Sequence, residues 1–184
     1  MKWQMLELVP EQTKTFAERF GISALAAEIF LRRGITAPDE LRFYLDNNIR
    51  SAHNPFLFND MENVVERNNQ AVAEQEKAMV CGDRDVDGMT AAALIIRKLK
   101  GMGLDPVWRL PMEDSPYGLS TERVREAAEL GVTMIITVDC GITNLDEIDL
   151  AQENGIDVIV IDHHNPADEL PAAVGIINPK LEDA

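Results

Sequence analysis

Short apolar runs alternate with helical patterns through the second part of this 184-residue chain. The apolar runs are strand-sized and cover residues 78–81, 106–110, 132–138, 157–161 and 174–177. Stretches with the apolar spacing of helices lie between them, at 89–99, 121–130 and 145–153. Such alternation predicts a mostly parallel sheet with helices on both faces. We therefore expect an α/β fold for residues 76–184.

The first part of the chain carries helix signals and no strand signals. Helices are predicted over 15–31, 37–45 and 61–76, and Gly34 is expected to end the first of them. We expect residues 1–75 to form a helical N-terminal lead-in to the α/β lobe.

Composition limits the kind of protein this is. No apolar run approaches the length of a membrane span. Two cysteines, Cys81 and Cys140, are too few for a disulfide framework, so we expect a cytoplasmic protein. Their spacing is not that of zinc ligands, which favours buried residues at strand ends. Trp3 and Trp108 are expected in the core rather than as stacking platforms.

The chain is strongly acidic, with a formal net charge of -15. The imbalance lies in residues 71–184, which hold 9 Lys or Arg against 22 Asp or Glu. A protein that holds nucleic acid through its overall charge is basic. Either the substrate is small, or the acidic half surrounds metal ions and the basic groove lies elsewhere. A solvated acidic surface accounts for part of the charge.

Acidic and imidazole side chains gather directly after three of the apolar runs. They are Asp83, Asp85 and Asp87 after the first run, Asp139 after the third, and Asp162, His163 and His164 after the fourth. Ligands of open parallel sheets bind at the carboxyl ends of the strands, and these ends share one edge. Crowded carboxylates repel one another unless a cation lies between them. The sequence therefore predicts a metal site at this edge.

Carboxylates with one or two imidazoles suit Mn²⁺ or Mg²⁺. Two such ions about 3.5–4 Å apart can hold the attacking and leaving oxygens of a phosphoryl displacement. Asp139 is the best candidate to bridge two ions, because its strand lies between the other two clusters in sequence. The alternatives are a surface loop that caps the next helix at 83–88 and a simple turn at Asp139. Tyr117 and Gly118 are either a substrate contact or the entry to a helix.

Four segments together resemble the motifs of a known superfamily. They are GDRDVDGMTAAALI, PYGLS, IITVDCGITN and VIVIDHHNP, and they are similar to the successive motifs of the DHH phosphoesterase superfamily. The similarity is greatest to its RecJ family of single-strand-specific 5′-to-3′ DNA exonucleases, and it extends through the helical lead-in. It implies the DHH fold and metal-dependent phosphodiester hydrolysis that releases 5′-nucleotides in DNA repair and recombination.

The resemblance also implies a two-metal site, supplied with Mn²⁺ or Mg²⁺. Asp85 and Asp139 would hold one ion, and Asp87, Asp139 and His163 would hold the other. Asp83 would lie in or next to the coordination sphere, and a water activated by the ions would be the nucleophile.

Further roles are implied for the neighbouring residues. Asp162 would orient His163, and His164 would contact the scissile phosphate or its neighbours. Tyr117 and Gly118 would contact the substrate. Single-stranded DNA is the implied partner, together with repair proteins, and no membrane is involved.

The chain departs from the family pattern at three places. Arg84 stands where the family usually has tyrosine. Residues 112–116 lack the basic residue and the Glu-Gly pair that often precede Tyr-Gly-Leu. The family continues past the position of Ala184 to a further Asp ligand, a second lobe and an oligonucleotide-binding barrel. We therefore expect residues 76–184 to be a catalytic lobe that is incomplete at its C-terminus, with the basic groove in the lobes beyond it.

Three functions remain open at this point. The leading one is an exonuclease catalytic lobe. The second is a small-substrate DHH phosphoesterase acting on short oligonucleotides, cyclic dinucleotides or pyrophosphate, although such members start near the first motif. The third is an inactive DHH-like scaffold, against which the intact Asp139 and Asp162-His163-His164 argue.

Overall fold

The chain forms two compact units, Met1–Asn54 and Pro55–Ala184. The computed structural model describes residues 10–46, 48–112 and 117–181. The first unit is helical, with α1 (Pro10–Phe20), α2 (Ala24–Arg32), α3 (Pro38–Leu45) and the 3-10 turn η1 (Ile49–Ser51). Its small core consists of Phe16, Ala27, Ile35 and Leu41. Trp3 lies outside the described residues.

The single helix predicted over 15–31 is wrong, because the chain breaks between α1 and α2. Gly21 has a φ of 64°, a left-handed conformation that ends a helix. The side chain of Ser23 then accepts a hydrogen bond of 3.1 Å from the Ala26 amide and caps α2. Apolar spacing alone did not reveal the break, because both helices bury residues in the same core.

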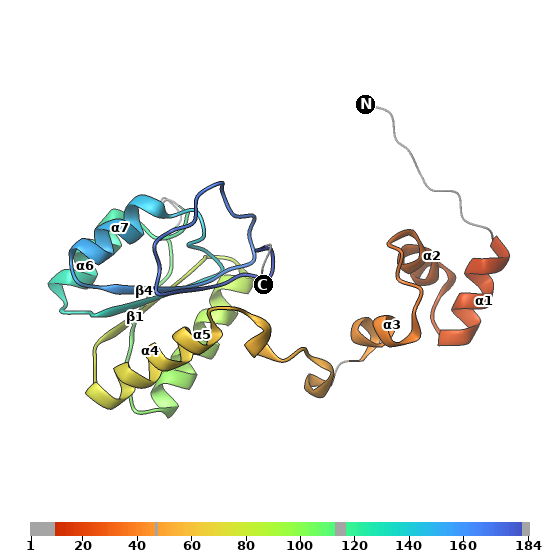
Figure 1. Ribbon diagram of the computed structural model, residues 1–184, viewed down its shortest axis with the longest axis horizontal. Coiled ribbons are helices and arrows are strands. Elements are labelled where there is room, and N and C mark those ends of the chain that lie inside the picture. The colour runs from red at the N-terminus through yellow and green to blue at the C-terminus, as the bar shows by residue number, and fades with distance from the viewer. Residues whose placement is uncertain (1–9, 47, 113–116, 182–184) are drawn as a thin grey trace. The chain divides into compact units, whose positions relative to one another are not determined.

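The second unit is a five-stranded parallel sheet with helices on both faces (Figure 1). Its elements are η2 (Pro55–Leu57), α4 (Met61–Glu74), β1 (Ala78–Gly82), α5 (Val86–Gly101), β2 (Val107–Arg109), α6 (Thr121–Glu129), β3 (Met134–Val138), α7 (Leu145–Glu153), β4 (Asp157–Ile161) and β5 (Gly175–Ile177). The strand order is β2-β1-β3-β4-β5, and every pair is parallel. The α/β fold expected from the sequence is confirmed.

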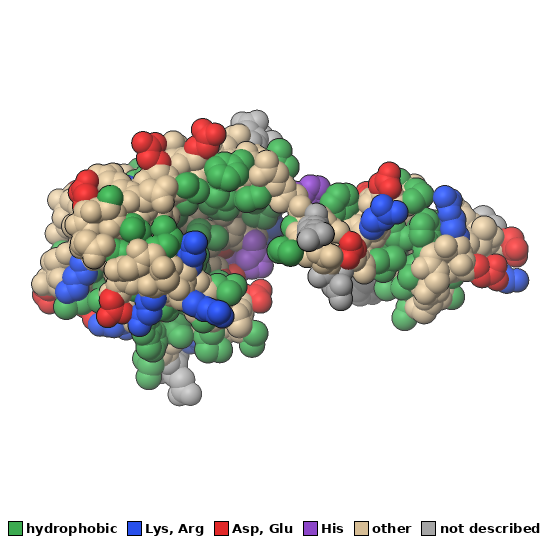
Figure 2. Space-filling view, turned by 90° about the horizontal axis from the view of Figure 1, so that it is seen from below, with side chains coloured by type: hydrophobic (Ala, Val, Ile, Leu, Met, Phe, Trp, Pro, Cys, Tyr) green, Lys and Arg blue, Asp and Glu red, His purple; other side chains and the backbone are tan. Residues whose placement is uncertain are grey.

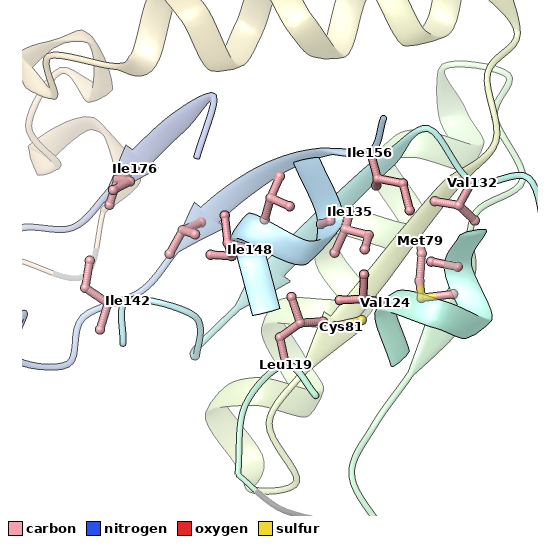
Figure 3. Close-up of a cluster of buried hydrophobic side chains, with 14 residues drawn as sticks. Met79, Cys81, Leu119, Val124, Val132, Ile135, Ile142, Ile148, Ile156 and Ile176 are labelled. Atoms are coloured by element: carbon pink, nitrogen blue, oxygen red, sulfur yellow. The ribbon is translucent and has the colours of Figure 1, made fainter. Parts of the chain in front are cut away.

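Two apolar cores enclose the sheet. Met79 and Cys81 of β1 pack with α6 and α7 on one face (Figure 3). Ala78 and Val80 of the same strand pack with α4 and α5 on the other. Successive side chains of a strand point to opposite faces. Burial of both faces therefore explains why the strands are continuous apolar runs in the sequence.

Helix α4 belongs to the unit that contains the sheet, and an ion-pair network fixes it at the amino edge. Arg67 of α4 donates to both carboxylate oxygens of Glu76, at 3.0 and 2.7 Å, and its Nε lies 2.5 Å from Asp157 Oδ2 at the start of β4. Thr133, just before β3, donates its hydroxyl to Glu76. The amino ends of three strands are thereby joined to α4.

The sequence predicted that both cysteines and Trp108 are buried, and the structure confirms this for the cysteines only. Cys81 and Cys140 are free and buried, and burial raises the pKa of Cys81 to about 12. The expectation that Trp108 lies in the core is wrong, because its side chain is 53% exposed. β2 is an edge strand of the sheet, so Trp108 has a neighbouring strand on one side only.

Among the helices of the described residues, none is long and apolar enough to cross a membrane.

Candidate metal centre

Three adjacent strands end in register, and each is followed directly by an aspartate. Gly82 at the end of β1 pairs with Val138 of β3, which pairs with Ile161 of β4. The next residues are Asp83, Asp139 and Asp162, with exposed fractions of 7%, 6% and 5%. The structure thus brings to one edge of the sheet the acidic groups that the sequence placed after separate apolar runs.

Asp139 occupies the middle of this row in an unusual backbone conformation. Its φ is 60°, which few residues other than glycine, asparagine and aspartate adopt. Its amide donates to the Ile161 carbonyl at 2.8 Å, which fixes the turn against β4. Gly141 completes the turn with a φ of 112°, where a Cβ atom would lie 2.4 Å from Thr137 Oγ1. The turn therefore accepts no larger residue at position 141.

Two groups of potential metal ligands share Asp139. Asp83, Asp85 and Asp139 form one group, and Asp139, His163 and His164 form the other, each with ligand atoms within 4.8 Å of one another. Asp139 is thus the residue common to both groups, and its role as a bridging ligand stays a prediction. Asp87 lies in the first turn of α5 and belongs to neither group within the described part of the chain. Its role as a ligand stays a prediction.

Two buried carboxylate oxygens have no hydrogen-bond partner among the described residues: Oδ1 of Asp83 and Oδ1 of Asp139. His163 Nε2 lies 2.9 Å from Asp139 Oδ1. Buried polar atoms without partners are rare and costly, unless an ion or water satisfies them. A site rich in carboxylate oxygens with imidazole nitrogens nearby fits Mn²⁺ or Mg²⁺.

The pKa values of Asp139 and Asp85 are shifted in opposite directions. Burial raises the pKa of Asp139, and the nearby negative charge of Asp85 raises it further. The pKa of Asp85 is lowered, mainly because its carboxylate accepts a hydrogen bond of 3.0 Å from the Gly88 amide. This bond also caps α5, which explains why the helix begins at Val86 rather than at residue 89 as predicted.

Asp162 is surrounded by donors. Its Oδ2 accepts from the Ile142 amide at 3.1 Å, and its Oδ1 accepts from the amides of His163 and His164 at 2.7 and 3.0 Å. Oδ1 also lies 2.7 Å from ring atom Nδ1 of His164. Burial opposes the charged form of Asp162, but these hydrogen bonds outweigh it and lower the pKa. Asp162 therefore orients the ring of His164, whereas the resemblance implied that of His163.

Tyr117 joins the same network from the loop before α6. Its hydroxyl donates to the Asp139 carbonyl at 3.1 Å and lies 3.2 Å from His164 Nδ1. Burial raises the pKa of Tyr117, so the hydroxyl keeps its proton beside the carboxylates. Gly118 has a φ of 80°, and a Cβ atom there would lie 2.5 Å from Asn144 Oδ1. The loop thus presents Tyr117 to the centre by packing its next residue against Asn144.

Two asparagines that support the centre were not found by sequence reasoning. Asn144 accepts from the Leu119 amide at 3.1 Å and donates to the Leu119 carbonyl at 3.0 Å, which holds the Tyr117 loop in place. Buried Asn178 donates to the His164 carbonyl at 3.0 Å. Asn144 directly precedes α7, where asparagine is normally a helix cap, but its side chain makes no cap hydrogen bond. That mismatch becomes visible only in the structure.

Comparisons with known proteins agree with this geometry. Residues 77–184 match the model of the DHH family, N-terminal domain. The chain is 32% identical over 181 residues to the single-stranded-DNA-specific exonuclease RecJ of Bacillus subtilis, covering 98% of this chain and 23% of that protein. It is 38% identical over 165 residues to RecJ of Dickeya dadantii, covering 88% and 28%. The chain thus spans about a quarter of the length of these relatives.

A solved structure shows the same fold. The crystal structure of RecJ from Thermus thermophilus in complex with Mn²⁺ superposes with a TM-score of 0.69 at 30% identity, covering 97% of this chain and 25% of that one. The family match covers the whole sheet and the aspartates at its carboxyl edge. The chain therefore belongs to the DHH family.

Proposed function

We propose that this chain is the metal-binding catalytic lobe of a single-strand-specific 5′-to-3′ DNA exonuclease of the RecJ type. The observation that carries the proposal is the row of aspartates that follows three in-register strands, with Asp139 shared by two ligand groups. The similarity to RecJ proteins supplies the substrate class and the setting in DNA repair and recombination.

The residues divide into two sets of roles. Asp85, Asp139 and His163 would hold Mn²⁺ or Mg²⁺, with Asp83 beside them and Asp87 as a further candidate from α5. Divalent ions at such a site activate water and stabilise the charge that develops on the phosphate. Nδ1 of His164 lies 2.7 Å from Asp162 Oδ1, and with a proton on Nδ1 the Nε2 atom of a neutral ring would be an acceptor. The half-exposed ring of His164 and the hydroxyl of Tyr117 would position the phosphate.

The test compares substrates with the full-length protein in Mn²⁺. We expect hydrolysis of 5′-phosphorylated single-stranded DNA with release of mononucleotides, no cleavage of duplex DNA, and no activity in Asp139→Ala. Asp149→Asn, on the exposed side of α7, is the matched control and should retain full activity. Cleavage of dinucleotides alone would favour the small-substrate phosphoesterase, and no cleavage of either would favour the scaffold.

Location and partners follow from the same proposal. A cytoplasmic location is supported by two cysteines that are free although both are buried. Repair proteins as partners stay a prediction that rests on the RecJ resemblance.

A further inference from the structure

A hollow of about 640 Å³ lies over the carboxyl end of the edge strand β2. Its lining includes Arg84, Met89, Trp108, Arg109, Met112 and Arg123, and we call it the β2 hollow. A smaller hollow shares Arg109, Leu110, Pro111 and Arg123 with it and extends to Gly82 and Gly118. Because Gly82 precedes Asp83 and Gly118 follows Tyr117, the smaller hollow borders residues of the metal centre.

The β2 hollow is rich in arginine although the chain is acidic. Three of the described residues that line it are arginines and none of the described lining residues is acidic, whereas Glu122 lines the smaller hollow. Glu126 of α6 is paired with both Arg109, at 2.5 Å, and Arg123, at 2.7 Å, so a single carboxylate serves two guanidinium groups. Two guanidinium groups paired with one carboxylate favour an anionic ligand. Figure 2 shows Lys and Arg side chains close to the depression of the larger unit in which histidine side chains are visible.

An exposed aromatic side chain adds a second kind of contact. Trp108 is 53% exposed and Met89 is 45% exposed, on the strand and helix that flank the hollow. Single-stranded nucleic acid is held by this combination, in which aromatic rings stack on bases and cationic groups contact the backbone. Stacking on a tryptophan needs a base that is not paired, which excludes the interior of a duplex.

We propose that the β2 hollow binds the single strand adjacent to the scissile phosphate, with a base stacked on Trp108 and backbone phosphates at Arg84 and Arg123. The proposal rests on the proposed function, because it gives the strand a path from the hollow to the carboxylates. It also explains how so acidic a lobe retains an anionic substrate: three arginines line the hollow in which the strand would lie. Arg84, which departs from the family motif, is then a strand-binding residue.

The test measures binding separately from hydrolysis. Fluorescence anisotropy gives the affinity of the full-length protein for a 3′-labelled, 5′-phosphorylated thymidine oligonucleotide in Ca²⁺. We expect Trp108→Ala to weaken binding by roughly 10-fold, as for other stacking residues. Trp108→Phe should restore most of the affinity. Arg84→Gln should weaken binding and reduce the salt dependence by about 0.7 in log–log slope, the contribution of one phosphate contact.

Arg125→Gln is the matched control, because Arg125 is exposed on α6 and lines neither hollow. It should leave the affinity within about twofold of that of the unmodified protein, as expected of a surface substitution. Unchanged affinity in both Trp108→Ala and Arg84→Gln would overturn the proposal, as would an effect equal to that of Arg125→Gln. Mn²⁺-dependent hydrolysis, measured in parallel, tests the proposed function. If the Trp108 and Arg84 variants bind more weakly but the unmodified protein hydrolyses no DNA, the proposed binding site is supported and the proposed exonuclease function is contradicted.

Discussion

Acidic side chains have different partners at the two edges of the sheet. At the amino edge, Glu76 and Asp157 both pair with Arg67, which is only 9% exposed. At the carboxyl edge, Asp83 and Asp139 lie close to Asp85, and Oδ1 of Asp83 and Oδ1 of Asp139 have no hydrogen-bond partner among the described residues. The same lobe therefore pairs two acids with one arginine at the amino edge and leaves two buried carboxylate oxygens without a hydrogen bond at the carboxyl edge.

The difference suggests that the amino edge serves stability and the carboxyl edge serves metal binding. A buried carboxylate that serves stability is matched by a cation from the chain itself, since an unmatched charge is costly to bury. We call the carboxylates of Asp83 and Asp139 open, and we expect them to reduce the stability of the metal-free chain because an external cation would complete them. Asp162 is intermediate, because backbone and ring donors satisfy it without a cation.

The largest effect is expected from neutralising the centre of the carboxyl edge. Asp139→Asn should lower kcat/KM of the full-length protein at least ~1000-fold, because a ligand shared by both ions is lost. Asparagine tolerates the left-handed backbone at this position, so the fold should remain intact. Urea unfolding of the metal-free variant should show equal or greater stability than the unmodified chain. A variant that is inactive because it unfolds would contradict the contrast between the edges.

A second substitution removes the ion pairs of the amino edge. Arg67→Met leaves Glu76 and Asp157 without their cation, and it should lower the free energy of unfolding by roughly 3 kcal/mol, as for other broken buried pairs. Urea denaturation measures the loss, and Mn²⁺ affinity should not change. Arg125→Met, at an exposed position, is the control and should have little effect. If folded Arg67→Met protein lost Mn²⁺ binding, the ion pairs at the amino edge would influence metal binding at the carboxyl edge, which would contradict the contrast.

Mn²⁺ should stabilise the lobe through the carboxyl edge alone. At a free concentration about 100 times the dissociation constant, one bound ion raises the free energy of unfolding by about 2.7 kcal/mol. We expect this gain in the unmodified chain and in Arg67→Met, but not in Asp139→Asn. Thermal unfolding with and without Mn²⁺ measures it, and Ca²⁺ or Mg²⁺ can be compared in the same way. Equal stabilisation of all three proteins would place the ions elsewhere.

The smallest effect is the pH dependence of the amino edge. Hydrogen bonds from Arg67, opposed by partial burial, lower the pKa of Glu76 from its ordinary value of 4.5. The ionised pair therefore contributes its full stability above pH 4.5, and the contribution is lost as the pH falls through the lower folded-state pKa. Glu76→Gln should flatten this part of the stability curve, measured by urea unfolding between neutral and acidic pH. A curve as steep as that of the unmodified chain would assign the acid sensitivity to other groups.

The elements were predictable from the sequence where local pattern and tertiary packing agree. β4 spans the predicted residues 157–161 and α7 the predicted residues 145–153, because each is bounded by clear turn signals. The helix over 15–31 failed because its apolar spacing continues across Gly21, whereas the backbone does not. The placement of the aspartates at one edge followed from the rule for parallel strands and needed no side-chain detail.

The contacts that complete the site were not predictable in the same way. The choice of His164 rather than His163 as the ring partner of Asp162 depends on how the chain turns after β4. Arg67 meets Asp157 across 90 positions of sequence, and no local pattern marks that contact. Exposure of Trp108 depends on β2 being an edge strand, and strand order is a property of the assembled sheet.

The most direct test of the central claim is a Mn²⁺ titration of the metal-free protein, followed by the electron paramagnetic resonance signal of the free ion. We predict saturable binding to the unmodified protein and to Arg67→Met, and binding weakened at least 100-fold in Asp139→Asn, since a coordinating carboxylate is removed. Equal Mn²⁺ binding by Asp139→Asn and the unmodified protein would contradict the claim that the open carboxylates at the carboxyl edge form the metal site.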